Sequence, residues 1–160
     1  MPTIYIETSI VSYLRQQSGT QVVAAARQVL THRWWNEERA NYELVTSQYV
    51  LDEAADGDTD LSAQRLELLD GIPLLTADPG IERIAHEMMA RAILPPKALF
   101  DALHIAMTAY HRVDYLLTWN CRHIANARIL PRIHRVLNDP GVPIPIICTP
   151  EEMAEDDPKS

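Results

Sequence analysis

The sequence predicts an α/β fold of three layers, in which helices cover both faces of a mainly parallel central sheet. Short apolar runs rich in β-branched residues alternate with longer segments whose apolar residues recur at helical spacing. Such alternation is typical of strand–helix–strand units with parallel strands. The 160 residues are enough for one ordinary domain. We therefore expect one domain over residues 1–150, followed by an acidic tail over residues 151–160.

The first half of the chain contains three predicted strands, and helical patterns follow each of them. The strands are expected at residues 3–6, 42–47 and 72–75, and the helices at 10–14, 21–40, 49–53, 61–69 and 79–92. Asp78-Pro79 marks a helix start, with Asp as the cap and Pro at the first helical position. Asp56, Asp58 and Asp60 have the spacing of a calcium loop, but the downstream Glu of an EF-hand is out of place. We interpret this stretch as a helix-capping turn.

The second half of the chain contains the clearest helical pattern, over residues 99–110. Its apolar side chains recur at helical spacing: Leu99, Leu103, Ala106, Met107 and Tyr110. A short strand is expected at residues 115–118, followed by a turn into a helix at 119–122. An amphipathic helix over 128–137 and a last strand over 144–148 complete the predicted fold.

Composition excludes several classes of protein. The formal charge of −8 argues against a protein that holds nucleic acid through a broad basic face, although acidic metal ligands contribute to such a charge. No stretch approaches the roughly 20 apolar residues of a membrane span. The start of the sequence lacks the pattern of a secretory signal, and two distant cysteines suit a reducing compartment. These features lead us to expect a cytoplasmic protein.

Four oxygen-bearing side chains are candidates for one site. Glu7 directly follows the first strand, Asn120 follows the strand at 115–118, and Glu53 lies one helical stretch beyond the second strand. Asp101 lies near the start of the 99–110 helix, where the helix dipole favours its ionised form. Active sites of open parallel sheets form outside the carboxyl ends of the strands. Oxygen ligands are those that Mg²⁺ and Mn²⁺ prefer, so the sequence allows a metal site there.

Four segments in this order resemble the motifs of PIN-domain proteins, and in particular the VapC-like toxins of bacterial toxin–antitoxin pairs. They are Ile4-Tyr5-Ile6-Glu7-Thr8-Ser9, Val50-Leu51-Asp52-Glu53-Ala54, Phe100-Asp101-Ala102-Leu103-His104-Ile105-Ala106 and Leu116-Leu117-Thr118-Trp119-Asn120. The resemblance extends over residues 2–148, and the segment that begins at Phe100 is the most specific part.

The resemblance implies a PIN-like fold and metal-dependent hydrolysis of RNA. Glu7, Glu53 and Asp101 would be carboxylate ligands of Mg²⁺ or Mn²⁺, and Asn120 would stand where many relatives have a fourth acid. Hydroxyl and imidazole groups around these ligands would orient them: Thr8, Ser9, His104, Thr118 and His123. The resemblance also implies an RNA substrate, a small antitoxin protein as partner, and a homodimer. The apolar segment over residues 22–35 is our candidate for a partner or dimer surface.

Two departures from the family pattern leave an alternative open. The family usually has Asp after the first strand, where this chain has Glu7, and Asn120 brings no charge. A PIN-fold module that binds RNA or protein without cutting it is therefore the first alternative. His104 is interpreted as a core or supporting histidine rather than a ligand, and His123 as a helix-surface residue. A phosphatase or phosphotransferase is a second alternative, disfavoured because the chain lacks a glycine-rich phosphate loop.

Overall fold

The computed structural model describes residues 1–16 and 21–154. Five parallel strands form one sheet in the order β3-β2-β1-β4-β5. The strands are β1 (Thr3–Ile6), β2 (Glu43–Ser47), β3 (Leu74–Leu75), β4 (Tyr115–Leu117) and β5 (Ile146–Cys148). The α-helices are α1 (Thr8–Arg15), α2 (Val22–Arg33), α3 (Gln48–Ala54), α4 (Thr59–Leu69), α5 (Pro79–Ala90), α6 (Leu99–Tyr110) and α7 (Leu130–Asn138). The predicted α/β class and parallel sheet are confirmed.

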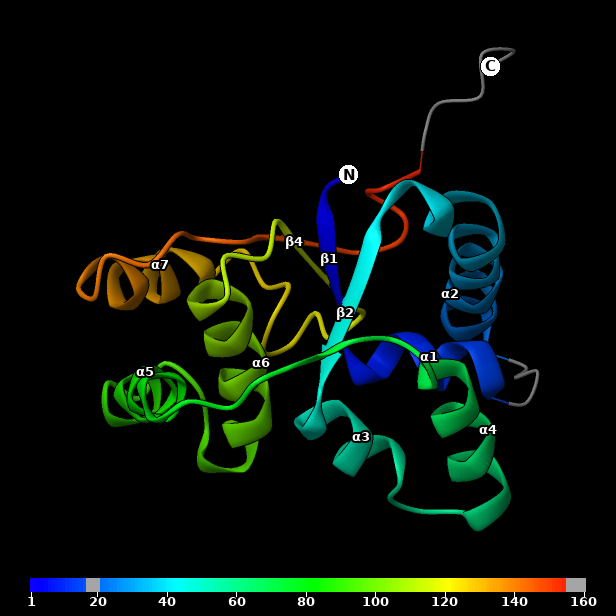
Figure 1. Cartoon of the computed structure of the whole chain (residues 1–160), viewed down its shortest axis with the longest axis horizontal. Coiled ribbons are helices and arrows are strands. Elements are labelled where there is room, and N and C mark those ends of the chain that lie inside the picture. The colour runs from blue at the N-terminus through cyan, green and yellow to red at the C-terminus, as the bar shows by residue number, and fades with distance from the viewer. Residues whose placement is uncertain (17–20, 155–160) are drawn as a thin grey trace.

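Helices cover the two faces of the sheet (Figure 1). α5, α6 and α7 gather on one side of β1 and β2, and α1, α2 and α4 gather on the other. The chain leaves β1 toward β2 on one side, while β4 pairs with β1 on the other side. This reversal of strand order between β1 and β4 opens the crevice in which α/β proteins bind ligands. The ends of these two strands therefore define where a site is expected.

The core is built on β1 and α6. Ile4, Tyr5 and Ile6 are fully buried, because β1 is the central strand and both of its faces are covered. α6 is buried from Ala102 to Ala109, since it packs between the sheet and α5. A helix buried on all sides carries few polar residues, so a histidine inside it requires a partner. His104 is such a residue, with no exposed surface.

The start of α5 follows the predicted capping pattern. Asp78 accepts a hydrogen bond from the Gly80 backbone N–H at 2.7 Å, and Pro79 opens the helix. We expect Asp78→Ala to reduce the free energy of unfolding by about 1 kcal/mol, as the loss of an N-cap does. Urea unfolding measures this change. Glu67→Ala is the control, because Glu67 is exposed, lies outside the first turn of α4, and its side chain accepts no hydrogen bond among the described residues. Equal losses in both variants would contradict the capping role.

The predicted 21–40 helix was too long, and only part of its apolar stripe is buried. α2 ends at Arg33, and a π-helical turn (Trp34–Glu38) and a 3₁₀ turn (Arg39–Asn41) follow. Trp34, the first residue of the π-helical turn, is buried and packs against Tyr42 with ring centroids 5.9 Å apart. By contrast Val22, Val23 and Val29 are 83%, 65% and 68% exposed. Part of the periodic pattern therefore faces solvent.

A turn is present at residues 121–124, as predicted after the fourth strand, but it does not lead directly into a helix, because regular helix begins only at Leu130. The Asn120 side-chain oxygen accepts a hydrogen bond from the His123 backbone N–H at 2.9 Å, and the Asn126 side-chain oxygen accepts one from the Arg128 backbone N–H at 2.9 Å. Asparagine contacts of this kind stabilise turns in competition with helix. The segment after β4 is consequently a series of turns.

The two edge strands are shorter than predicted. β3 contains only Leu74 and Leu75, and β5 begins at Ile146. Pro73, Pro143 and Pro145 lack the backbone N–H that a ladder needs, which limits the strands at these positions. Residues 155–160 of the predicted tail lie outside the described part of the chain. No helix in the described ranges has the length and apolar character needed to cross a membrane.

Candidate metal site

Glu7 lies at the junction of β1 and α1. It caps α1, and its Oε2 accepts hydrogen bonds from the Ser9 N–H at 3.1 Å and from the Ser9 hydroxyl. The Thr118 hydroxyl, from the end of β4, donates to the same oxygen at 2.7 Å. The Trp119 N–H in turn donates to Ser9 Oγ at 2.8 Å, which ties the end of β4 to the start of α1. The predicted supporting residues Ser9 and Thr118 thus both contact Glu7.

Glu53 approaches Glu7 from α3. Its Oε1 accepts hydrogen bonds from Thr8 Oγ1 at 2.7 Å and from His104 Nε2 at 2.5 Å. The contact joins the ends of β1 and β2 to the middle of α6. One oxygen of each glutamate therefore carries all the hydrogen bonds that the carboxylate accepts from the described residues. The other oxygen of each has none from them.

Behind His104 lies a buried chain of hydroxyl groups that the sequence reasoning missed. His104 Nδ1 is 2.7 Å from the Tyr5 hydroxyl, and that hydroxyl is 2.6 Å from Ser47 Oγ. All three side chains are fully buried. A tyrosine inside a buried strand was the available signal, because a buried phenol requires a hydrogen-bond partner.

Asp101 and Asn120 both contact His123. Asp101 Oδ2 is 3.0 Å from His123 Nδ1, and Asn120 Oδ1 accepts the His123 backbone N–H at 2.9 Å. The His123 side chain is only 17% exposed, so it is not the helix-surface residue we predicted. It lies in the turns after β4 because the Asn120 amide holds the backbone there. Asp101 is the predicted ligand that stands apart from the two glutamates, paired with this second histidine.

Burial and neighbouring charges shift the pKa values of the site residues in different directions. Burial raises the pKa of Glu7, because an ionised carboxylate loses its hydration there. Burial acts on Glu53 in the same direction, but the hydrogen bond and charge of His104 and the Thr8 hydroxyl outweigh it and lower the pKa of Glu53. The pKa of His104 is raised against its burial by the hydrogen bond to Glu53 and by the surrounding carboxylates. Burial raises the pKa of Asp101 despite His104 and His123.

The donor set fits a divalent cation. Glu7, Glu53 and His104 each offer a ligand atom, and these atoms all lie within 4.8 Å of one another. Two buried or half-buried carboxylates so close together repel, and a bound cation relieves that repulsion. Each glutamate keeps one oxygen without a hydrogen bond from the described residues. Carboxylate oxygens suit both Mg²⁺ and Mn²⁺.

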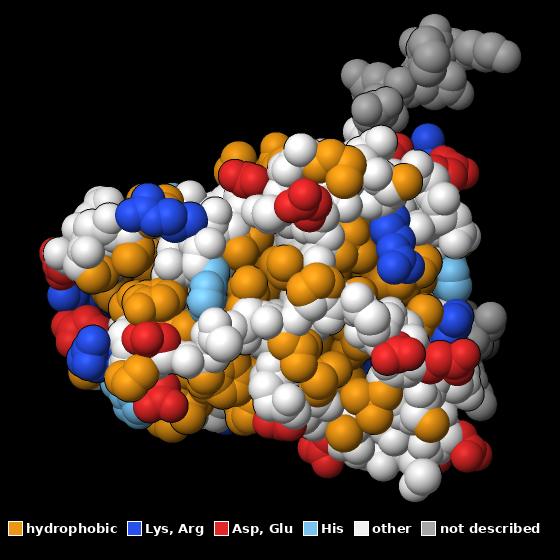
Figure 2. Space-filling view, viewed as in Figure 1, with side chains coloured by type: hydrophobic (Ala, Val, Ile, Leu, Met, Phe, Trp, Pro, Cys, Tyr) orange, Lys and Arg blue, Asp and Glu red, His pale blue; other side chains and the backbone are white. Residues whose placement is uncertain are grey.

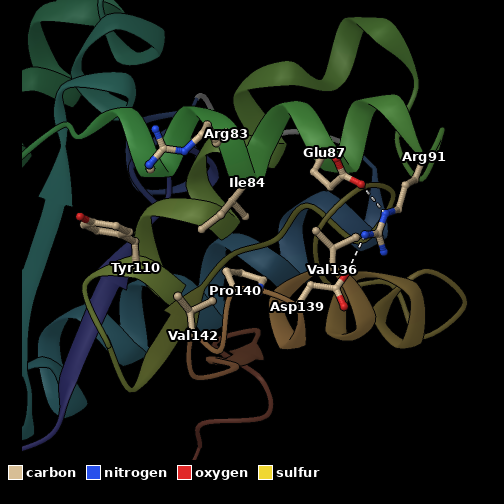
Figure 3. Close-up of a pocket in the computed structure, with 10 residues that line it drawn as sticks. Arg83, Ile84, Glu87, Arg91, Tyr110, Val136, Asp139, Pro140 and Val142 are labelled. Atoms are coloured by element: carbon tan, nitrogen blue, oxygen red, sulfur yellow. Dashed lines mark hydrogen bonds and ion pairs between the residues drawn. The ribbon is translucent and has the colours of Figure 1, made fainter.

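A separate cavity of about 430 Å³ lies between α5, α6 and the end of α7 (Figure 3). Apolar side chains from these elements line it, with Arg91 at one end. Arg91 is paired with Glu87 at 2.7 Å and with Asp139 at 2.5 Å. None of the predicted site residues lines this cavity, so it is distinct from the candidate metal site.

Comparison with solved structures is informative about the fold. The crystal structure of VapC20 from Mycobacterium tuberculosis, a sarcin-ricin loop cleaving toxin, matches with a TM-score of 0.56. The match covers 76% of this chain and 92% of that chain, at 18% sequence identity. The chain has a PIN-like fold. No protein-family model matches the sequence, and no curated protein matches it either.

The PIN-like fold explains why these side chains converge. β1 and β4 are neighbours, so Glu7 and Thr118 meet at their carboxyl ends. α3 and α6 bring Glu53 and His104 to the same edge. The predicted positions Glu7, Glu53 and Asp101, together with Asn120, lie around one end of the sheet. Their roles as metal ligands stay predictions.

Proposed function

We propose that this protein is an endoribonuclease that hydrolyses RNA with the help of Mg²⁺ or Mn²⁺. One observation carries the proposal: the carboxylates of Glu7 and Glu53 meet beside the His104 ring at the switch point of a PIN-like sheet, with one atom of each of the three side chains within 4.8 Å of the others. The likeness to VapC20, which is described as a sarcin-ricin loop cleaving toxin, supports the choice of RNA as substrate.

In this proposal the chain's own residues hold and shape the site. Glu7 and Glu53 supply the negative charge that retains a cation, with Asp101 as a third carboxylate and Asn120 as a neutral oxygen donor. Thr8, Ser9 and Thr118 orient the glutamates through the hydrogen bonds described above. When bound, the cation activates water and neutralises the charge that develops on phosphate oxygens. No covalent bond to the protein is needed.

RNA contacts are expected to be local. On the face shown in Figure 2, Lys and Arg side chains stand apart from one another and form no continuous basic surface among the coloured residues. The candidates for phosphate contacts are four arginines between β4 and the end of α7: Arg122, Arg128, Arg132 and Arg135. All four are exposed. Phosphate contacts supply most of the non-specific affinity of a protein for RNA. With only a few such contacts, we expect RNA to bind weakly outside the metal site.

We further propose that the protein is the toxin of a toxin–antitoxin pair, acts in the cytoplasm as a homodimer and is held by a small antitoxin. The support is the likeness to a toxin and the exposed valines of α2. Val22 and Val29 are seven residues apart and form a short apolar strip on one face of α2, and Val23 is exposed about 100° around the helix from that strip. An exposed apolar strip of this kind suits a protein partner.

A module that binds RNA or protein without cutting it is the second candidate. The specific observation in its favour is the engagement of both histidines, because His104 pairs with Glu53 and His123 pairs with Asp101. Histidines that neutralise carboxylates compete with a cation for them. The neutral Asn120 at the position of a family acid points the same way.

Metal removal tests the proposal. Purified protein is incubated with a mixed RNA pool in Mn²⁺, in Mg²⁺ and in excess chelator. We expect cleavage with metal, loss of cleavage in chelator, and recovery when Mn²⁺ is added back. An Asp101→Ala preparation, purified in parallel, controls for a contaminating nuclease. Metal-loaded protein that leaves the RNA intact would favour the non-cleaving alternative.

A further inference from the structure

The buried chain Ser47–Tyr5–His104 ends on Glu53, and its geometry constrains the histidine. Glu53 is ionised and can only accept hydrogen bonds, so His104 Nε2 carries the proton of the 2.5 Å contact. The other ring nitrogen faces the Tyr5 hydroxyl at 2.7 Å. A neutral ring accepts the Tyr5 proton at Nδ1, and a charged ring donates to the Tyr5 oxygen. Tyr5 therefore occupies Nδ1 in either state.

The Tyr5 hydroxyl is itself fixed by Ser47. In the 2.6 Å contact between Tyr5 and Ser47 either hydroxyl can donate. The hydrogen bonds from Ser47 through Tyr5 to His104 can therefore all point toward the histidine or all point away from it. Tyr5 and Ser47 lie on β1 and β2, the central strand and its neighbour. Both side chains are fully buried. The His104 ring is consequently held by rigid parts of the sheet rather than by a loop.

The orientation of His104 determines which atoms of Glu53 are engaged. His104 and Thr8 both donate to Oε1 of Glu53, and no described residue donates to Oε2. A carboxylate held in this way presents a single oxygen to a ligand. Groups that hold metal ligands from behind are known to set metal affinity.

We propose that Tyr5 is a positioning residue of the metal site, whose buried hydroxyl fixes the His104 ring so that His104 holds one oxygen of Glu53 and leaves the other for a divalent cation. The inference deepens the proposed function and rests on it. His104 then supports the site by hydrogen bonding instead of coordinating the cation.

The test is Mn²⁺ binding to the full chain, measured by isothermal titration calorimetry without RNA. Tyr5→Phe keeps the ring and removes the hydroxyl, and we expect Mn²⁺ affinity to fall about ten-fold. Ser47→Ala, which disturbs the chain one step further away, should produce a smaller loss in the same direction. Tyr115→Phe is the matched control, because Tyr115 lies on the adjacent strand β4 and no hydrogen bond of its hydroxyl occurs among the described residues. It should bind Mn²⁺ like the wild type.

A double-mutant cycle separates positioning from packing. In a His104→Gln background the amide can donate to Glu53 without help from Tyr5, so Tyr5→Phe should cost less than about two-fold in affinity there. The ¹⁵N shifts of the His104 ring should also change in Tyr5→Phe and stay constant in Tyr115→Phe. The NMR measurement reports on the ring in any folded variant, whatever its metal affinity.

The outcomes distinguish the inference from the proposed function. The inference alone is overturned if Tyr5→Phe binds Mn²⁺ with wild-type affinity and leaves the His104 ring spectrum unchanged. It is also overturned if Tyr5→Phe lowers Mn²⁺ affinity equally in the wild-type and His104→Gln backgrounds. Wild-type protein that neither binds Mn²⁺ nor cleaves RNA overturns both. A selective loss in Tyr5→Phe that vanishes in the His104→Gln background supports the positioning role.

Discussion

Glu53→Gln is expected to reduce RNA cleavage by at least about 100-fold, because a metal site contributes several kcal/mol of transition-state stabilisation and each 1.36 kcal/mol is a factor of ten. The substitution keeps the length and shape of the side chain and removes its charge. Glu53 Oε1 already accepts two hydrogen bonds, from Thr8 and His104, so the amide oxygen can replace it there. The amide nitrogen would then stand where the second oxygen is needed, and it cannot coordinate a cation.

The control for this variant lies one residue away. Asp52 is an exposed acid on the same helix, bonded to Gln48 at 2.9 Å, and its removal changes net charge equally. Asp52→Asn should retain cleavage within about two-fold, as surface substitutions away from a site generally do. Single-turnover cleavage and Mn²⁺ titration measure both variants. Comparable activity in Glu53→Gln and the wild type would remove Glu53 from the site.

Glu7→Gln is expected to have opposite effects on activity and on stability. The charge of Glu7 is central to the proposed site, so cleavage should be lost. In chelator, however, the same change should raise stability by about 0.5–2 kcal/mol, as substitutions that relieve a strained active site commonly do. Burial is the cause, since Glu7 is only 4% exposed and burial, together with the nearby Glu53, disfavours the ionised form of its carboxyl and raises its pKa.

The sign of the pH dependence follows from the raised pKa of Glu7. The folded protein binds a proton at Glu7 more readily than the unfolded chain, whose carboxyl titrates near its ordinary value of 4.5. Below that value the carboxyl is protonated in both states and costs nothing. As the pH rises through the folded pKa, ionisation in the buried position lowers the stability of the wild type. The advantage of Glu7→Gln should therefore be present at pH 7 and disappear near pH 4.

Thermal unfolding in chelator across this pH range measures the difference, with about 2–4 °C expected per kcal/mol for a chain of this size. Glu43→Gln on β2 is the control, because Glu43 is exposed and its neutralisation should leave the melting temperature unchanged. A Glu7→Gln protein that is less stable than the wild type at pH 7 would contradict the burial argument. Addition of Mn²⁺ should stabilise the wild type and leave Glu7→Gln unaffected.

Local chemistry was a reliable guide for elements whose own residues determine them. The Asp78-Pro79 start of α5, the Asp58 cap of α4 and the limits of α6 agree with the predictions. The helix predicted over residues 21–40 was too long, because periodicity did not reveal the π-helical turn that begins at Trp34. The length of the turn region after β4 was missed for a related reason, since the side chains of Asn120 and Asn126 stabilise it by contacts that helical spacing does not report.

The sequence by itself determined the α/β class, the parallel strands and the acids that approach one edge of the sheet, because strand patterns and residue types are local properties. Only the tertiary structure decided how those acids are paired. Glu53 meets His104 across 51 residues, and Asp101 meets His123 across 22. The Tyr5 and Ser47 hydroxyls join His104 only because β1, β2 and α6 pack together. Such pairings depend on the distances between elements, which packing sets and no spacing along the chain encodes.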